Sequence, residues 1–182
     1  MDYIACTGRL ATARDLPAVA AIYAAVHAAD AAGITATGWE PGVYPTRATA
    51  QAALERGDLY VFEAEGQVVG SAVINHLQMP AYAQVPWTQA APPQRVLVLH
   101  TLAIDPALGR HGCGSAAVAF YEAQARLRGC PCLRMDTNLR NLPARSLYRR
   151  LGYRELGAVE CTFNGIPGVP LLMLEKILPE CL

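Results

Sequence analysis

Hydrophobic and polar positions in the amino-terminal part of the chain recur mainly with a helical period. Apolar residues follow this spacing over residues 15–29, with Asp15 as the expected N-cap and Pro17 in the first turn, which predicts a helix. A second helix is predicted over residues 46–57, because a glycine at its end favours helix termination. Residues 4–7 are expected to form a short strand before both helices.

Short apolar runs dominate the middle of the chain. Residues 59–62 and 67–74 flank the dipeptide Glu65-Gly66, and this arrangement predicts a β-hairpin. Residues 96–104 are apolar along nearly their whole length, which favours a strand buried on both faces. The long connection over residues 76–94 has a length that is usually functional or part of an interface.

The remaining part of the chain alternates helical and strand patterns. Because hairpins come first and βα units later, we expect one mixed, twisted sheet with helices on both sides, an α/β fold of the mixed α+β kind. A length of 182 residues suits a single domain over residues 1–182. The predicted helices are 112–128 and 143–151, and the predicted strands are 133–136, 153–160 and 169–176.

Composition narrows the possible partners. The formal net charge is zero, which argues against nucleic acid or an anionic membrane as the main partner. No apolar run approaches the ~18 residues that span a bilayer, and no secretion signal is expected from the first residues. The six cysteines lack zinc-knuckle spacing, so we expect free thiols, no metal and a cytoplasmic location.

A glycine-rich turn follows the predicted strand 96–104 and opens the next helix. A helix N-terminus offers unpaired N–H groups and a partial positive charge, and glycines at 112 and 114 let a phosphate approach these groups closely. The turn therefore suits a pyrophosphate. Its residues are Gly109, Arg110, His111, Gly112, Cys113, Gly114 and Ser115, of which the last adds a hydroxyl.

Two other phosphate-binding motifs compete for this turn. A Walker A loop does not fit, since no Gly-Lys-Ser/Thr is present. A dinucleotide fingerprint fits the residues from Gly112 to Ala117, with Asp136 as the acidic residue at a strand end. However, a long segment separates Ile104 from Gly112, and too little chain follows for a full dinucleotide fold. A dinucleotide-binding oxidoreductase remains a weaker alternative.

A second motif follows the predicted strand 133–136, in the spacing Asn-x-x-Ala-x-x-Leu-Tyr-x-x-x-Gly-Tyr. Together with Leu102-Ala103-Ile104 and the Gly112-x-Gly114 turn, it resembles the GNAT family of N-acetyltransferases. That family has Arg or Gln where this chain has Gly109, and Arg110 stands one place late. The residues that carry the second motif are Asn141, Ala144, Leu147, Tyr148, Gly152 and Tyr153.

The resemblance implies acetyl-CoA as co-substrate, bound by the glycine turn and the second motif. It also implies a twisted, mostly antiparallel mixed sheet of six to seven strands flanked by about four helices. The backbone of Leu102, Ala103 and Ile104 is expected to pair with the pantetheine arm and to polarise the acetyl carbonyl. Asn141 is expected to contact the pantetheine or to cap the helix.

Tyr148 is the expected general acid, as the equivalent tyrosine is in the family. A phenol with a pKa near ~10 can donate a proton to a departing thiolate whose thiol has a pKa near ~8.5. Ala144 lies one helical turn earlier and leaves room for the pantetheine arm. A core tyrosine that packs the helix onto the sheet is the alternative.

The incoming amine must lose a proton, so a base is expected. His100 is the first candidate, because it lies two residues before Leu102 and is therefore expected on the same strand face. This placement resembles arylalkylamine acetyltransferases. A hydrogen-bonded core histidine is an equal alternative. Glu40, in the loop after the first helix, is the second candidate, and a solvated loop position is its alternative. His76, at the end of the predicted hairpin, is the third candidate.

The loops over residues 33–45 and 76–94 are expected to cover the acceptor pocket. Their aromatic residues suit an aromatic or amphipathic amine or, equally, a homodimer contact. The resulting hypothesis is acetyl transfer to a primary amine of a small molecule or peptide by direct attack in a ternary complex. The alternative is a non-catalytic acyl-CoA-binding sensor or structural protein. The candidate acceptor-binding residues are Trp39, Tyr44, His76, Tyr82 and Trp87.

Overall fold

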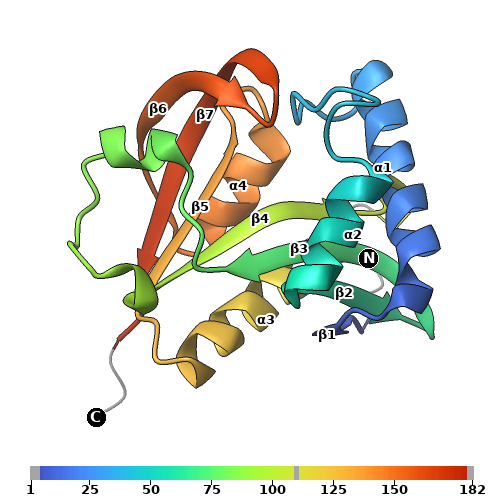
Figure 1. Cartoon of the computed structure of the whole chain (residues 1–182), viewed down its shortest axis with the longest axis horizontal. Helices are drawn as coiled ribbons and strands as arrows, with labels where there is room; N and C mark the ends of the chain where they lie inside the picture. Colours follow the sequence, from blue (N-terminus) through green and yellow to red (C-terminus); the bar gives the residue numbers. More distant parts are fainter. Residues whose placement is uncertain (1–4, 109–110, 180–182) are drawn as a thin grey trace.

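One seven-stranded sheet forms the centre of the molecule, in the order β1-β2-β3-β4-β5-β7-β6 (Figure 1). The computed structural model describes residues 5–108 and 111–179. All neighbouring strands are antiparallel except β4 and β5, which confirms the mostly antiparallel mixed sheet. The strands are β1 (Thr7–Leu10), β2 (Leu59–Ala64), β3 (Gln67–Asn75), β4 (Val96–Ile104), β5 (Cys132–Asn138), β6 (Arg154–Phe163) and β7 (Ile166–Ile177).

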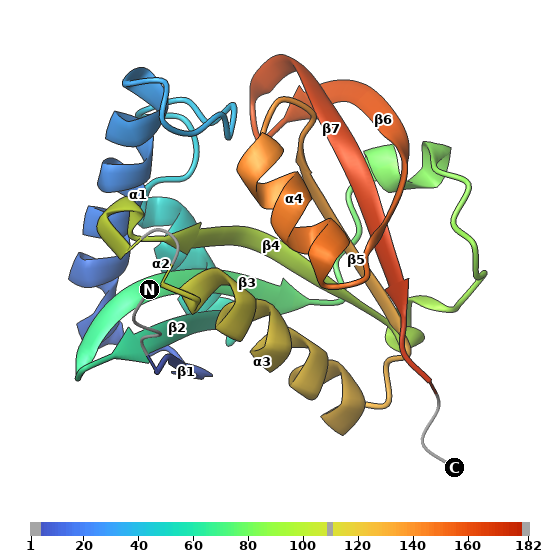
Figure 2. The same ribbon diagram turned by 180° about the vertical axis from the view of Figure 1, so that it is seen from behind.

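Helices cover both faces of the sheet, as the sequence predicted. The helices α1 and α2 pack on one face, whereas α3 and α4 pack on the other (Figures 1 and 2). No helix in the described part of the chain is long and apolar enough to cross a bilayer. The helices are α1 (Leu16–Ala31), α2 (Arg47–Arg56), α3 (Cys113–Leu127) and α4 (Leu142–Arg150).

The ends of α2 agree with the sequence prediction, whereas the predicted N-cap hydrogen bond of α1 does not form. The Thr46 side chain accepts a hydrogen bond from the Thr49 N–H, and Gly57 ends α2 with φ of 74°. Asp15 also precedes α1, but its side chain does not cap that helix and instead forms an ion pair with Arg9 at 2.8 Å.

The first strand lies later in the chain than the sequence pattern predicts. The strand β1 begins at Thr7, the last residue of the predicted range 4–7, and it pairs with β2. The residues before position 5 lie outside the described part of the chain.

The parallel strands β4 and β5 pair only over the first part of their length. Their register runs from Val96 opposite Cys132 to Leu99 opposite Met135 and is not continued beyond this point in the described chain. Strand β5 continues to Asn138 against β7, and β4 continues against β3. The two strands therefore diverge and leave a gap at their carboxyl ends (Figure 1).

A β-bulge lies in β4 beside this gap. The register pairs His100 with Val73 and Ala103 with Ser71, so three steps along β4 match two along β3. Thr101 sits within the bulge with φ of 50°, a left-handed conformation that is uncommon for a β-branched residue. The Tyr44 hydroxyl forms a hydrogen bond with the Thr101 hydroxyl, which holds this conformation against the loop before α2.

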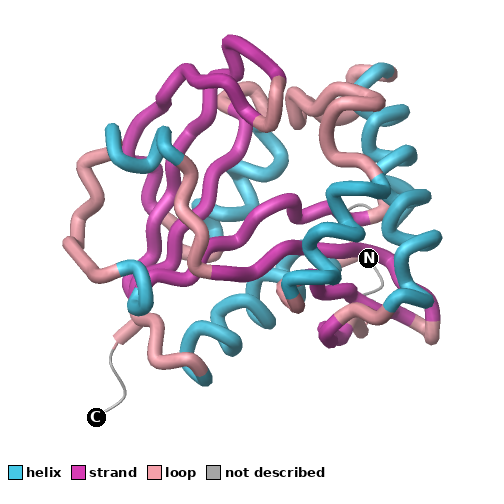
Figure 3. The backbone as a smooth tube through the Cα atoms, in the orientation of Figure 1, coloured by secondary structure: helices cyan, strands magenta, loops and turns pink. Residues whose placement is uncertain are grey.

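The long connection between β3 and β4 is mostly loop with short helical turns (Figure 3). Arg134 of β5 anchors it, because the guanidinium donates to Gln78 Oε1 at 2.6 Å and to the Gln89 carbonyl at 3.0 Å. Glu175 of β7 lies 3.6 Å from the same guanidinium and accepts from the Thr88 N–H at 2.9 Å. The connection is therefore held in place by contacts with the strands β5 and β7.

Candidate active site

A cavity of about 70 Å³ occupies the gap between β4 and β5. It is lined from both faces of the sheet, by α4 on one face and by the loop after α1 together with Phe163 on the other. Two components can therefore meet within it from opposite sides. The lining residues are Thr37, Trp39, Leu99, Thr101, Leu102, Asp136, Thr137, Asn138, Asn141, Ala144, Tyr148, Phe163 and Leu171.

Helix α4 presents one face to this cavity. Asn141, Ala144 and Tyr148 all line it, which confirms the prediction that the last two share a helix face. The Asn141 side chain accepts from the Ala144 N–H at 3.3 Å, so this residue caps α4 and also faces the cavity. Tyr148 is 6% exposed, and burial raises the pKa of its phenol well above the usual 10, which keeps the hydroxyl protonated at neutral pH.

Gly152 and Tyr153, the last two residues of the second motif, have structural roles and do not line the cavity. Gly152 ends the α4 segment with φ of 87°, in the left-handed region that favours glycine. The Tyr153 ring is buried in the core, and its hydroxyl donates to Glu122 of α3 at 3.3 Å.

The glycine turn begins α3, although Gly109 and Arg110 lie outside the described residues. Gly112 has φ of 91° at the N-cap, and Cys113 is buried with its side chain among apolar neighbours. A Cβ at position 114 would lie 3.1 Å from Leu147 Cδ2, so glycine there also allows α3 and α4 to approach. His111 and Ser115 of this turn are partly exposed.

The carboxyl-terminal part of β4 leaves one backbone edge free for a ligand. The strand pairs with β3 up to Ile104, but in the described chain its other edge has no β5 partner after Leu99. Leu102 lines the cavity at this edge, while the Ala103 side chain faces the α1 core. This geometry fits the predicted pairing of residues 102–104 with a pantetheine arm, which is itself an extended chain with amide groups.

Asp136 is the residue that sequence reasoning missed as a candidate base. It lies near the end of β5, lines the cavity and is partly buried. Its Oδ2 accepts a hydrogen bond from the Tyr82 hydroxyl at 2.9 Å. Burial raises the pKa of this carboxyl to about 6, and the Tyr82 hydrogen bond opposes that rise. A carboxylate with a pKa close to neutral, facing a cavity, is well suited to accept a proton.

The bulge at Thr101 makes the predicted orientation of His100 wrong. His100 and Ala103 share the face toward α1, whereas Leu102 packs on the other side with the α3 core. The His100 Nε2 is 3.0 Å from the Leu77 carbonyl, and His100 is not among the residues that line the cavity. Burial also lowers its pKa to about 4, so His100 is a weaker base than Asp136.

Glu40 does not reach the cavity either. It is exposed, and its backbone forms a tight turn with Tyr44. The loop that carries it nevertheless shapes the site, because the Trp39 ring lines the cavity and makes an edge contact with Tyr44 at 6.1 Å. The Tyr44 ring in turn lies 5.1 Å from that of Phe163 of β6.

Gly38 brings this loop against the end of β5. Its φ is +71°, and a Cβ at this position would lie 2.2 Å from Asn138 Nδ2. The side chain of Asp30 holds the same loop by accepting hydrogen bonds from the Thr35 and Thr37 hydroxyls. Thr37 and Asn138 both line the cavity, so the close approach at Gly38 sets one of its walls.

The connection between β3 and β4 contributes less to the cavity than the sequence predicts. Tyr82 is 2% exposed and acts through its hydrogen bond to Asp136. The Trp87 ring packs over the Arg134 guanidinium at 4.2 Å, and its N–H donates to the Tyr82 carbonyl, so it holds the loop rather than facing the cavity. His76 is exposed, with Nδ1 2.7 Å from the Val96 carbonyl at the opposite end of β4.

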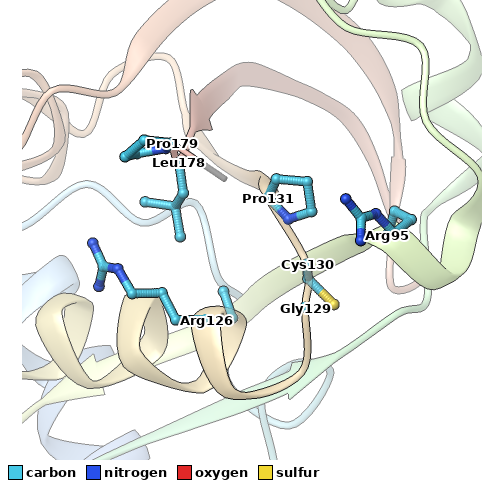
Figure 4. Close-up of a pocket in the computed structure, with 8 residues that line it drawn as sticks. Arg95, Arg126, Gly129, Cys130, Pro131, Leu178 and Pro179 are labelled. Atoms are coloured by element: carbon cyan, nitrogen blue, oxygen red, sulfur yellow. The ribbon is translucent and has the colours of Figure 1, made fainter. Parts of the chain in front are cut away.

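A larger cavity of about 290 Å³ lies where α3 ends and β5 begins (Figure 4). Arg95, Arg126 and Cys130 line it together with prolines and Leu178. None of the described residues of the second motif or of the glycine turn lines it. Residues 5–108 and 111–179 contain no group of three or more His, Cys, Asp or Glu side chains that could hold a metal ion.

Solved structures share this architecture over nearly their whole length. An acetyltransferase of the GNAT family from Streptococcus agalactiae is 22% identical, with a TM-score of 0.74 over 99% of this chain and 100% of its own. The ribosomal-protein-alanine N-acetyltransferase from Brucella melitensis is 25% identical, with a TM-score of 0.69 over 94% and 99%. The protein yncA from Salmonella typhimurium, solved with its cofactor acetyl-CoA, is 21% identical, with a TM-score of 0.66 over 97% and 96%.

Comparison at the level of sequence places the chain in a family. No curated protein matches it. A model of the acetyltransferase (GNAT) family, however, matches residues 20–153, which include the loop after α1, the glycine turn and the whole second motif. The glycine turn that opens α3 and the tyrosine of α4 agree with this match. The chain belongs to the GNAT family of acetyltransferases.

Proposed function

We propose that this protein transfers the acetyl group of acetyl-CoA to a primary amine of a small molecule or peptide by direct attack within a ternary complex. The observation that carries the proposal is the joint presence of Tyr148 and Asp136 on one cavity between β4 and β5. The lining of that cavity from both faces of the sheet supports entry of the two substrates from opposite sides.

The chain offers a backbone and a phenol for the acetyl-CoA end of the reaction. The amides that open α3 are suited to the pyrophosphate, and the free edge of residues 102–104 is suited to the pantetheine. A backbone N–H at this edge would polarise the acetyl carbonyl, a contribution typically of about 3 kcal/mol to the barrier. Tyr148, protonated at neutral pH, would give its proton to the departing sulfur.

Asp136 is the proposed base, in place of His100 and Glu40. It would take one proton from the bound ammonium, so that the nitrogen lone pair can attack the acetyl carbon. The C–N bond forms, the C–S bond breaks and the nitrogen loses its second proton. One proton goes to the sulfur through Tyr148 and the other goes to solvent, so the products are an acetamide and CoA thiol.

The test is a thiol-release assay with acetyl-CoA and a panel of primary amines, run on the wild type and on Tyr148→Phe. We expect the variant to lose about 10²- to 10⁴-fold in kcat, which is the usual contribution of general acid catalysis. Its affinity for CoA, measured by calorimetry, should stay within a few-fold. Equal rates for the two proteins would refute the acid role. CoA uptake without thiol release for any amine would instead favour the non-catalytic sensor.

A further inference from the structure

The acceptor side of the cavity has a single formal charge. Among the described residues that line it, Asp136 is the only one that is charged at neutral pH, and the others are neutral polar or apolar. A pKa of about 6 leaves this carboxyl mostly ionised above pH 7. The free cavity therefore carries a partly buried negative charge.

No nearby cation in the described chain offsets this charge by direct contact. The only hydrogen bond that Asp136 receives there comes from the neutral Tyr82 hydroxyl. Arg134 lies two residues earlier on β5, but its guanidinium is already engaged by Glu175, by Gln78 and by the Trp87 ring. The carboxylate thus retains its attraction for a cationic ligand.

Apolar and aromatic side chains share the acceptor side of the cavity with this carboxylate. Trp39, Phe163 and Leu171 line the cavity on the face opposite α4. An ammonium group is stabilised both by the carboxylate and by aromatic faces. A ligand carboxylate in the same space would be desolvated, would lie close to a like charge and would find no lining cation among the described residues.

We infer that the acceptor is a primary amine without an acidic group beside its nitrogen, such as an alkylamine, an arylalkylamine or an amine next to a neutral amide. Free α-amino acids are disfavoured by charge repulsion. This inference rests on the proposed function, since it concerns the acceptor of the same reaction. When a ligand carboxylate lies next to the Asp136 carboxylate, their repulsion should weaken binding on the order of 10- to 100-fold.

Three matched compounds test the inference: phenethylamine, phenylalanine and phenylalaninamide. They share an aromatic ring and a primary amine, and only phenylalanine carries a carboxylate. We expect kcat/KM for phenethylamine and phenylalaninamide to exceed that for phenylalanine by at least about tenfold. Calorimetric binding to the CoA-loaded protein should show the same order, which provides a readout that does not need turnover.

Two variants identify the carboxylate responsible. In Asp136→Asn the binding preference over phenylalanine should shrink to within a few-fold, whereas Glu160→Gln, which removes an exposed carboxylate of β6, should preserve it. Phenylalanine bound or acetylated as well as its amide would overturn the inference, and so would failure of all three compounds to bind. Selective binding of the two amines without thiol release would contradict the proposed function and leave the charge selectivity standing.

Discussion

The Tyr82 hydroxyl donates a 2.9 Å hydrogen bond to Asp136 Oδ2, and this contact joins the long connection between β3 and β4 to the candidate active site. It is the main polar support of a carboxylate that burial has made less acidic. Arg134 and Glu175 hold this connection through hydrogen bonds with its residues, so the Tyr82 ring is kept in position. The pKa of Asp136 is therefore determined largely by burial and by one neutral donor.

The first prediction concerns the pH dependence of the reaction. Only the ionised carboxylate can accept a proton, so kcat/KM should rise with pH through about 6 and then level off. The groups that face Asp136 from neighbouring elements are the Tyr44, Tyr82 and Tyr148 phenols and the Cys161 thiol. Burial raises all four pKa values, so none of these groups should ionise near pH 6.

Asp136→Asn should remove this acid limb and lower kcat/KM by about 10²- to 10⁴-fold at pH 8. Glu160→Gln is the matched control and should keep the wild-type profile. A normal acid limb in Asp136→Asn would show that another group is the base.

A second prediction concerns the effect of the Tyr82 hydroxyl on the pKa of Asp136. The Tyr82 hydroxyl stabilises the ionised form of Asp136 and so lowers its pKa. Tyr82→Phe removes that donor, and the acid limb should move to higher pH by up to about one unit, with the plateau rate largely retained. Rate measurements between pH 5 and pH 9 would check this. A limb that stays in place, or moves to lower pH, would contradict the assigned contact.

A third prediction concerns stability. The pKa of Asp136 is raised in the folded state from 3.8 to about 6, so the native state binds more protons than the unfolded state between these values. Stability therefore falls as pH rises through this window, and the ionised group costs up to about 3 kcal/mol above it. Asp136→Asn should thus be more stable than wild type at pH 7.5 while being less active.

Urea unfolding of the two proteins would measure this difference. The stability gain should be present at pH 7.5 and should diminish toward pH 4, where the wild-type carboxyl is protonated. A loss of stability at pH 7.5 would mean that the carboxylate has a structural role.

A fourth prediction concerns the loop that carries Trp39. An added Cβ at Gly38 would approach Asn138 Nδ2 to 2.2 Å, so Gly38→Ala should push the loop away from the end of β5. We expect KM for the amine to rise several-fold, with CoA affinity unchanged. Gly33→Ala is the control, because Gly33 has the same φ of +71° but no neighbour within 4 Å of an added Cβ. Equal effects of both variants would attribute the change to backbone strain alone.

The sequence predicted the helices and most strands well because their periodicity and caps are local properties. Thr46 and Gly57, for example, end α2 as their residue types favour. The motif also brought Asn141, Ala144 and Tyr148 to one helix face, where the structure has them. The orientation of His100 could not be predicted, since the bulge depends on a positive φ at Thr101 that a distant partner, Tyr44, supports.

Asp136 was overlooked for a related reason. A carboxylate at a strand end is common, and its function emerges only where β5 separates from β4 and exposes it to a cavity. The available signal was the presence of two charged residues, Arg134 and Asp136, at alternate positions of one strand, since charged side chains are seldom buried without partners in a sheet centre. Arg134 has a structural role and Asp136 lines the cavity because of their partners Glu175 and Tyr82. These partners are distant in the sequence, so no local pattern reveals them.

The most direct test of the account is a crystal structure of the protein with CoA bound. We predict that the pyrophosphate lies at the beginning of α3, that the pantetheine runs along residues 102–104, and that the sulfur lies within hydrogen-bond reach of the Tyr148 hydroxyl, with Asp136 across the same cavity. CoA bound in the cavity of Arg95 and Arg126, or a sulfur far from residue 148, would contradict the account.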